Sequence, residues 1–151
     1  MVNILKKFFL LLLLSVCTSI LFACQSQSEE MTIVDSVSEI SISESNGYGG
    51  LNENYFDLIN QTETISDFEE ALKNTKEINR DVDVTNEKPD YDILIRYENG
   101  DTHGLHLLLG NVEEESIIMY IGHENKGYVI SPKDTNKLRK ILDVQWKSLL
   151  N

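Results

Sequence analysis

The dipeptide Asn99-Gly100, which lies between two apolar segments, constrains the fold more than any other feature of this chain. Residues 91–97 and 103–109 flank it. The first segment mixes tyrosine, isoleucine and leucine with single polar residues, and the second contains four leucines, two histidines and a glycine. Asn-Gly favours a two-residue type I′ turn, because both central residues of that turn need positive φ. We therefore expect a β-hairpin at this point.

The register of this hairpin follows if Asn99 and Gly100 are the two turn residues. It pairs Tyr97 with Thr102, Ile95 with Gly104, Ile93 with His106, and Tyr91 with Leu108. The opposite face then carries Asp92, Leu94, Arg96, His103, Leu105 and Leu107. Both faces contain apolar residues, which indicates a central pair of strands with one side under helices and the other partly covered or open for contact.

Three more strands are predicted around this hairpin. Residues 116–121 and 127–130 flank a polar turn at 123–126 and predict a second hairpin. The alternation of residues 39–43 predicts an earlier strand, and the glycines of residues 46–50 predict a loop after it.

Two amphipathic helices are also predicted. The first begins at Ser66, because Ser66-Asp67-Phe68-Glu69 matches a capping box, and it ends near Asn79. Its apolar face comprises Phe68, Ala71, Leu72, Thr75 and Ile78. The second begins at Ser131-Pro132, and its apolar face comprises Leu138, Ile141, Leu142, Gln145 and Leu149. Because strict βαβ alternation is lacking, we expect an α+β domain with an antiparallel sheet of about five strands, a meander of two hairpins, packed with two helices.

The N-terminal segment has the three-part layout of a secretory signal. Lys6 and Lys7 precede an apolar run at 8–14, and Leu21-Phe22-Ala23-Cys24 looks like the lipobox of bacterial lipoproteins. In proteins with that motif, cleavage falls between the alanine and the cysteine, and the cysteine is diacylated. We therefore expect a signal peptide over 1–23, lipidation at Cys24, a tether over 24–30 and one extracytoplasmic domain over 31–151. The alternative is that residues 4–23 remain as a transmembrane anchor.

Charge and cysteine content limit the function classes. Loss of Lys6 and Lys7 with the signal leaves 11 basic residues against 25 acidic ones, a net charge of −14. Nucleic acid is excluded as a partner, since its phosphates must be neutralised by Lys and Arg. Cys17 lies in the signal and Cys24 would carry lipid, so no thiol or disulfide chemistry is expected. An exported domain without disulfides is typical of Gram-positive bacteria, and we expect such a host.

The histidines do not indicate a metal site. His103 and His106 are three residues apart on one strand, so their side chains point to opposite faces and cannot chelate one metal ion. We expect His106 to complete a packed face opposite Ile93, His103 to lie on the solvent side beside Arg96, and His123 to be exposed in a turn.

Other motifs for catalysis or ligand binding are equally weak. The spacing from Asp81 to Asp92 is similar to that of a calcium loop, but Asn86 replaces the glycine that such a loop requires. The chain contains no Gly-x-Ser-x-Gly elbow. We therefore expect neither an enzyme nor a cofactor.

One family resemblance extends over residues 89–142. The matching residues are Pro89-Asp90-Tyr91-Asp92-Ile93, Tyr97-x-x-Gly100, Leu105-His106-Leu107-Leu108-Leu109, Met119, Tyr128-Val129-Ile130-Ser131 and Leu138-x-x-Ile141-Leu142. In these residues the chain resembles the YhfM-like small lipoproteins of bacteria, although Leu108 stands where similar proteins often have Trp. The resemblance implies a cell-surface lipoprotein domain of undefined activity and supplies no catalytic residue.

The leading interpretation is a non-enzymatic lipoprotein, anchored to the membrane through Cys24, that binds a protein or peptide at the cell surface. Candidate contacts are Tyr48 in the glycine-rich loop and Arg96, His103 and Leu105 on the less covered sheet face. The same residues could instead close the core under a helix. A small-ligand binder, which needs a concave apolar pocket, and a hydrolase without a recognisable motif stay open as alternatives.

Overall fold

The protein folds as an α+β domain whose elements are described by a computed structural model for residues 31, 36–78 and 87–149, with side chains up to residue 142. The elements are β1 (Val37–Glu44), β2 (Asp57–Ile59), α2 (Thr62–Lys73), β3 (Lys76–Glu77), β4 (Tyr91–Tyr97), β5 (Thr102–Leu108), β6 (Ser116–Tyr120), β7 (Gly127–Ile130) and α3 (Pro132–Leu149). The expected signal peptide, Cys24, the tether and Asp81 lie outside the described residues, as do the side chains of Gln145 and Leu149.

All seven strands form one antiparallel sheet in the order β2-β1-β4-β5-β6-β7-β3. The meander of two hairpins is confirmed as β4 to β7. The expected count of about five strands was wrong, because β2 and β3 form the two edges of the sheet. These edge strands are three and two residues long, too short to show an alternating pattern in the sequence.

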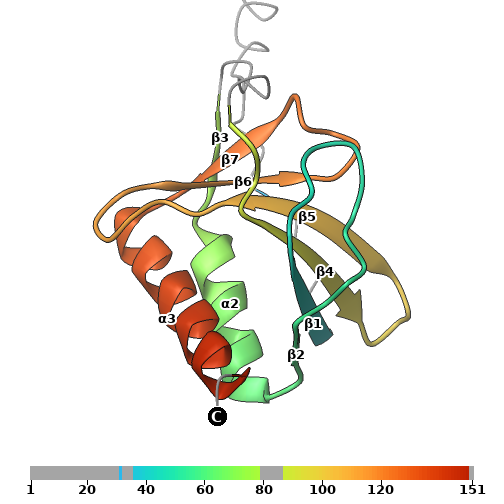
Figure 1. The fold of residues 1–151 in the computed structure, drawn as a ribbon. Helices are drawn as coiled ribbons and strands as arrows, with labels where there is room; N and C mark the ends of the chain where they lie inside the picture. Colours follow the sequence, from blue (N-terminus) through green and yellow to red (C-terminus); the bar gives the residue numbers. More distant parts are fainter. Residues whose placement is uncertain (1–30, 32–35, 79–86, 150–151) are drawn as a thin grey trace, which may run out of the picture.

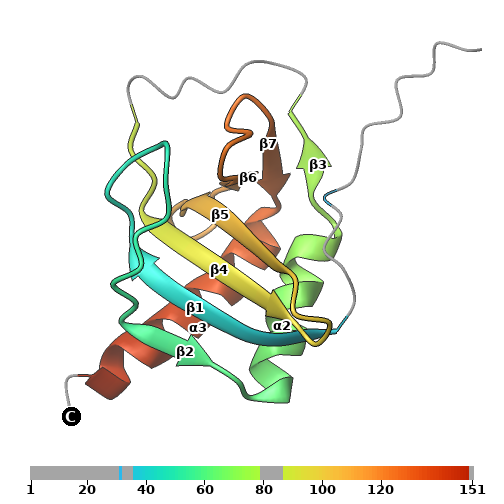
Figure 2. The ribbon, with the colours of Figure 1, turned by 90° about the vertical axis from the view of Figure 1, so that its right-hand side faces the viewer.

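Both helices cover the same face of the sheet. Figure 1 shows α2 and α3 side by side against this face, with the loop between β1 and β2 on the other side, and Figure 2 looks onto the sheet with the helices behind it. The core lies between the two layers and includes Ile40, Ile93 and Leu105 from the sheet and Phe68 and Leu138 from the helices. We call the uncovered side the helix-free face. Among the described residues, neither helix is long and apolar enough to cross a bilayer.

The central hairpin is confirmed, but its predicted register was wrong by one residue. The amide of Tyr97 donates to the carbonyl of Asp101, the amide of Gly100 donates to the carbonyl of Tyr97, and Gly100 has a φ of 92°. This is a three-residue turn with glycine in the left-handed position, rather than a type I′ turn. Arg96 therefore pairs with Thr102, and every side chain of β5 lies on the opposite face from the one predicted.

The start and end of the first helix also differ from the prediction. Helix α2 begins at Thr62 after Gln61, which makes no side-chain capping bond, so Ser66 is an interior residue. Glu69, the other member of the predicted capping box, instead accepts a hydrogen bond of 3.4 Å from the amide of Val37. The helix ends at Lys73, and Lys76 and Glu77 pair with β7 as strand β3. Tertiary contacts with the sheet therefore override the local capping signal.

The C-terminal half agrees more closely with the sequence analysis. Strands β6 and β7 form the predicted second hairpin, and α3 begins at Pro132. The hydroxyl of Ser131 accepts a hydrogen bond of 3.2 Å from the amide of Asp134 and donates to the Asp134 carboxylate at 2.8 Å. This confirms Ser131 as the residue that caps the helix.

Candidate functional site

A buried polar row crosses the helix-free face and brings Asp92 and His106 together. Asp92 on β4 pairs with Ser43 on β1 and with His106 on β5, which in turn pairs with Met119 on β6. All four side chains are buried although no helix covers this face. Their cover must therefore come from the loops above the sheet.

Asp92 and His106 form a close ion-pair geometry. The Oδ1 atom of Asp92 lies 2.7 Å from Nδ1 of His106, and both side chains have an exposed fraction of 0%. The second oxygen of Asp92, Oδ2, accepts a hydrogen bond of 2.8 Å from the amide of Asn52 in the loop after β1. Asp92 thus joins the histidine on the sheet to the loop that covers it.

The second nitrogen of His106 faces another carboxylate. Its Nε2 atom lies 3.7 Å from Oε1 of Glu124, in the turn between β6 and β7, and makes no hydrogen bond. Burial by itself raises the pKa of Glu124. The backbone amides of Gly122, Glu124 and Gly49 and the nearby His106 favour the ionised carboxylate, and together they hold the pKa below its usual value. His106 therefore lies between two carboxylates from different elements.

Residues 45–56, between β1 and β2, cover this row, and we call them the cover loop. The ring of Tyr48 meets the ring of His106 edge to face, with centroids 5.5 Å apart. The Ser43 hydroxyl donates a hydrogen bond to the carbonyl of Asn52 at 2.5 Å. Tyr48, predicted as a partner contact, is half-buried against the histidine rather than free in a loop.

The predicted contact residues Arg96, His103 and Leu105 do not share one face. Arg96 is exposed on the helix-free face and pairs with Glu39, with Nε and Oε1 3.1 Å apart. Leu105 is fully buried in the core on the helix side. His103 also lies on that side, opposite Ile95, so its predicted place beside Arg96 was wrong. The error follows from the one-residue shift in register.

His103 belongs to an aromatic cluster at one end of the sheet. Its Nδ1 atom lies 2.9 Å from the Tyr97 hydroxyl, and its ring is edge-on to the rings of Tyr97 and Tyr120. Tyr120 also contacts Tyr128 edge-on, at 6.1 Å between centroids. His123, in contrast, is exposed in a turn, as predicted.

This cluster predicts a loss of stability in alkali. Burial, with smaller effects of Tyr128 and Tyr97, raises the pKa of Tyr120 from 10.0 to about 12. A neutral phenol is then favoured in the folded state, so its contribution to stability is complete below pH 10 and is lost as the pH rises toward 12. Denaturation followed from pH 8 to pH 12 should show this loss, and Tyr120→Phe should reduce it. An equal loss in both proteins would contradict this role of Tyr120.

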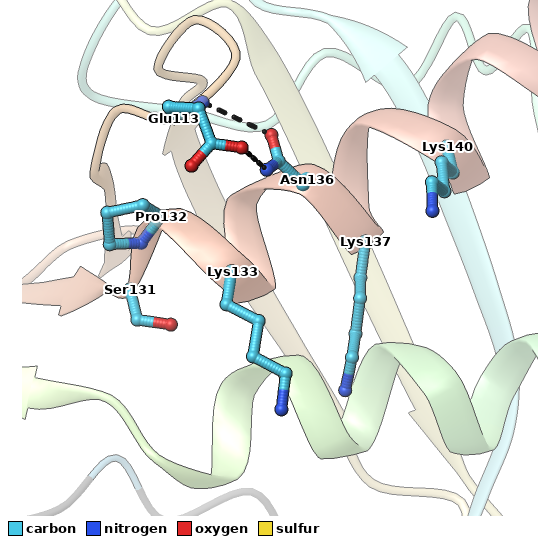
Figure 3. Close-up of a pocket in the computed structure, with 7 residues that line it drawn as sticks. All are labelled: Glu113, Ser131, Pro132, Lys133, Asn136, Lys137 and Lys140. Carbon is cyan, nitrogen blue, oxygen red and sulfur yellow. Dashed lines mark hydrogen bonds between the residues drawn. The ribbon is translucent and has the colours of Figure 1, made fainter.

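A separate depression lies beside the start of α3, as Figure 3 shows. It has a volume of about 680 Å³ and is lined by Lys133, Lys137 and Lys140, together with polar residues and Pro132. Lys137 pairs with Glu70 at 3.0 Å and with Asp134 at 3.5 Å, while Asn136 donates a hydrogen bond to Glu113. Neighbouring acids therefore balance part of its positive charge.

The sequence analysis missed two of the three members of the buried cluster. Asp92 was placed on the opposite face from His106, and Glu124 was treated only as part of a polar turn. A signal for Asp92 was present, because a lone carboxylate within an apolar strand needs a partner if it is buried. Across residues 31, 36–78 and 87–149, no three histidine, cysteine, aspartate or glutamate side chains meet in a way that could hold a metal ion.

Comparisons with known proteins agree with the fold. The family model described as YhfM protein matches residues 33–147. No curated protein matches the chain. Among solved structures, a thioesterase-like protein from Clostridium sporogenes ATCC 15579 is similar, with a TM-score of 0.55 and 23% sequence identity over 73% of this chain and 97% of that chain. At this identity the likeness concerns the fold alone.

Proposed function

We propose that this chain, which belongs to the YhfM family over residues 33–147, is a membrane-anchored lipoprotein whose domain binds a protein or peptide outside the cytoplasmic membrane. The argument for the anchor is the Leu21-Phe22-Ala23-Cys24 motif, with lipid on Cys24. Two acyl chains hold a protein stably at a bilayer, whereas one binds only marginally.

An apolar strip on the helix-free face carries the binding part of this proposal. Leu58 on β2, Leu94 on β4 and Ile121 after β6 lie in one row across the sheet, separated by Ser41 and Gly104. Leu58 is 56% exposed, and Leu94 and Ile121 are half-buried. Large, small and large side chains thus alternate across the row, which gives a shallow surface that an extended segment or a flat partner can cover.

Arg96 and Glu39 border this strip on one side. Arg96 on β4 pairs with Glu39 on β1, next to the pair of Leu94 and Ser41 on the same face of the sheet. Both charged side chains are partly exposed. A charged rim beside an apolar centre is the usual anatomy of a protein interface. Arg96 and Tyr48 remain candidate contacts, whereas buried Leu105 supports the fold instead.

The surroundings of His106 favour binding over catalysis. In a nucleophilic hydrolase the histidine nitrogen opposite the aspartate faces a hydroxyl or thiol. Here Nε2 of His106 faces the carboxylate of Glu124. The cluster therefore has the form of a structural ion-pair network beside the binding strip.

Site-specific crosslinking tests this proposal. A photoreactive amino acid at Leu94, on the strip, should yield a reproducible protein adduct on intact cells. The matched probe at Lys133, which is exposed on the helix side, should not. Mass spectrometry of the recovered chain should find diacylated Cys24 as the first residue.

Two outcomes would contradict separate parts of the proposal. Equal adducts from Leu94 and Lys133, or none from either, would count against the strip as the contact surface. An unmodified Cys24, or a retained signal peptide, would count against lipid anchoring.

A further inference from the structure

The cover loop lies against two carboxylates that flank one histidine. Asp92 accepts a hydrogen bond of 2.8 Å from the Asn52 amide, and the Gly49 amide is near enough to Glu124 to help hold the pKa of that carboxyl below its usual value. Asp92 meets Nδ1 of His106 at 2.7 Å, while Glu124 faces Nε2 at 3.7 Å. Three separate elements, β4, β5 and the turn after β6, thus converge beneath one loop.

The number of protons on His106 decides whether this arrangement is attractive. A neutral imidazole has one N–H and one lone pair. If the proton is on Nδ1, the lone pair of Nε2 faces the carboxylate of Glu124; if it is on Nε2, the lone pair of Nδ1 lies 2.7 Å from Asp92. Only the imidazolium form presents an N–H to both carboxylates.

Burial strengthens the electrostatic interactions among these three side chains. The side chains of Asp92 and His106 are fully buried, and that of Glu124 is 20% exposed. Interactions between such charges are screened far less than interactions at the surface. Loss of one proton from His106 therefore replaces an attraction with a repulsion inside the cluster that holds the loop.

Other hydrogen bonds between the cover loop and the strands do not change charge near neutral pH. The Asn52 carbonyl accepts from the Ser43 hydroxyl, the Asn52 side chain donates to the Glu44 carbonyl, and the amides of Ser45 and Phe56 donate to backbone carbonyls of Asp90 and Ile42.

The cover loop contains Gly47 and Gly49, whose φ angles are 119° and 94°, and it forms no strand or helix. Its other titratable groups are Tyr48, Glu53 and Tyr55. Glu53 is exposed, and tyrosine hydroxyls ionise only near pH 10, so near neutral pH the charge balance depends on Asp92, His106 and Glu124.

We propose that Asp92, His106 and Glu124 form a proton-dependent latch. With His106 protonated, the latch holds the cover loop closed over the sheet; when His106 loses its proton, the loop loosens and uncovers the polar row beside the apolar strip. The effect on partner binding rests on the function proposed above, whereas the latch itself does not.

Hydrogen exchange in the full-length protein tests the latch without any partner. NMR would follow the His106 ring and the protection factor of the Asn52 amide from about pH 5 to pH 9, the range in which histidine usually titrates. We expect protection of Asn52 to fall about tenfold as His106 loses its proton, with no change at the core amide of Ile93. A tenfold change corresponds to about 1.4 kcal/mol.

Two matched variants make the test specific. In Glu124→Gln, the side-chain amide can donate to a neutral Nε2, so protection of Asn52 should no longer depend on pH. His123→Gln removes an exposed histidine from the same turn and should leave the dependence unchanged. Constant protection in the wild type, a His106 that keeps one protonation state over this range, or pH dependence that persists in Glu124→Gln would each overturn the latch.

Discussion

Replacing Asp92 with alanine is expected to lower the free energy of unfolding by about 3–5 kcal/mol, because it removes one partner of a buried charged pair. His106 would lose the carboxylate 2.7 Å from its Nδ1 atom, and the Asn52 amide would lose its acceptor. Chemical denaturation followed by circular dichroism measures the change. Asp92→Asn, which keeps a hydrogen-bond acceptor but no charge, should fall between alanine and the wild type.

The matched control is the exposed pair on the same face. Arg96 and Glu39 are 3.1 Å apart, with side-chain exposed fractions of 50% and 35%. Because exposed ion pairs contribute little, Arg96→Ala should change stability by less than about 1 kcal/mol. Equal losses from Asp92→Ala and Arg96→Ala would mean that the buried cluster carries no special share of the stability.

The central hairpin shows how far a local signal reaches. Asn99-Gly100 correctly predicts that the chain reverses here, because glycine readily takes the positive φ that the turn needs. The same dipeptide fits a two-residue turn and a three-residue turn with Gly100 in the left-handed position. Packing of the whole sheet makes this choice, and the choice decides whether His106 lies opposite Ile93 or Asp92.

Other parts of the site depend on contacts that no short window of sequence contains. Glu124 reaches His106 only because the turn after β6 folds back over the sheet. The apolar strip includes Leu58, which belongs to an edge strand of three residues. The exposure of His123 was predicted, because it follows from its position in a turn. His106 was also predicted to be buried, but opposite Ile93, whereas it lies opposite Asp92 beneath the cover loop.

The first helix gives the second large prediction: Phe68→Ala should lower the free energy of unfolding by about 3–5 kcal/mol, the usual cost of removing a large buried aromatic ring. Phe68 is 2% exposed and packs in the core between α2 and the sheet.

Ser66→Ala is the matched control, two residues away on the exposed side of α2. If Ser66 capped the helix, its loss would cost about 1 kcal/mol; as an interior residue it should cost no more than about 0.5 kcal/mol. A large loss from Ser66→Ala with a small one from Phe68→Ala would mean that local capping, rather than packing on the sheet, determines where α2 begins.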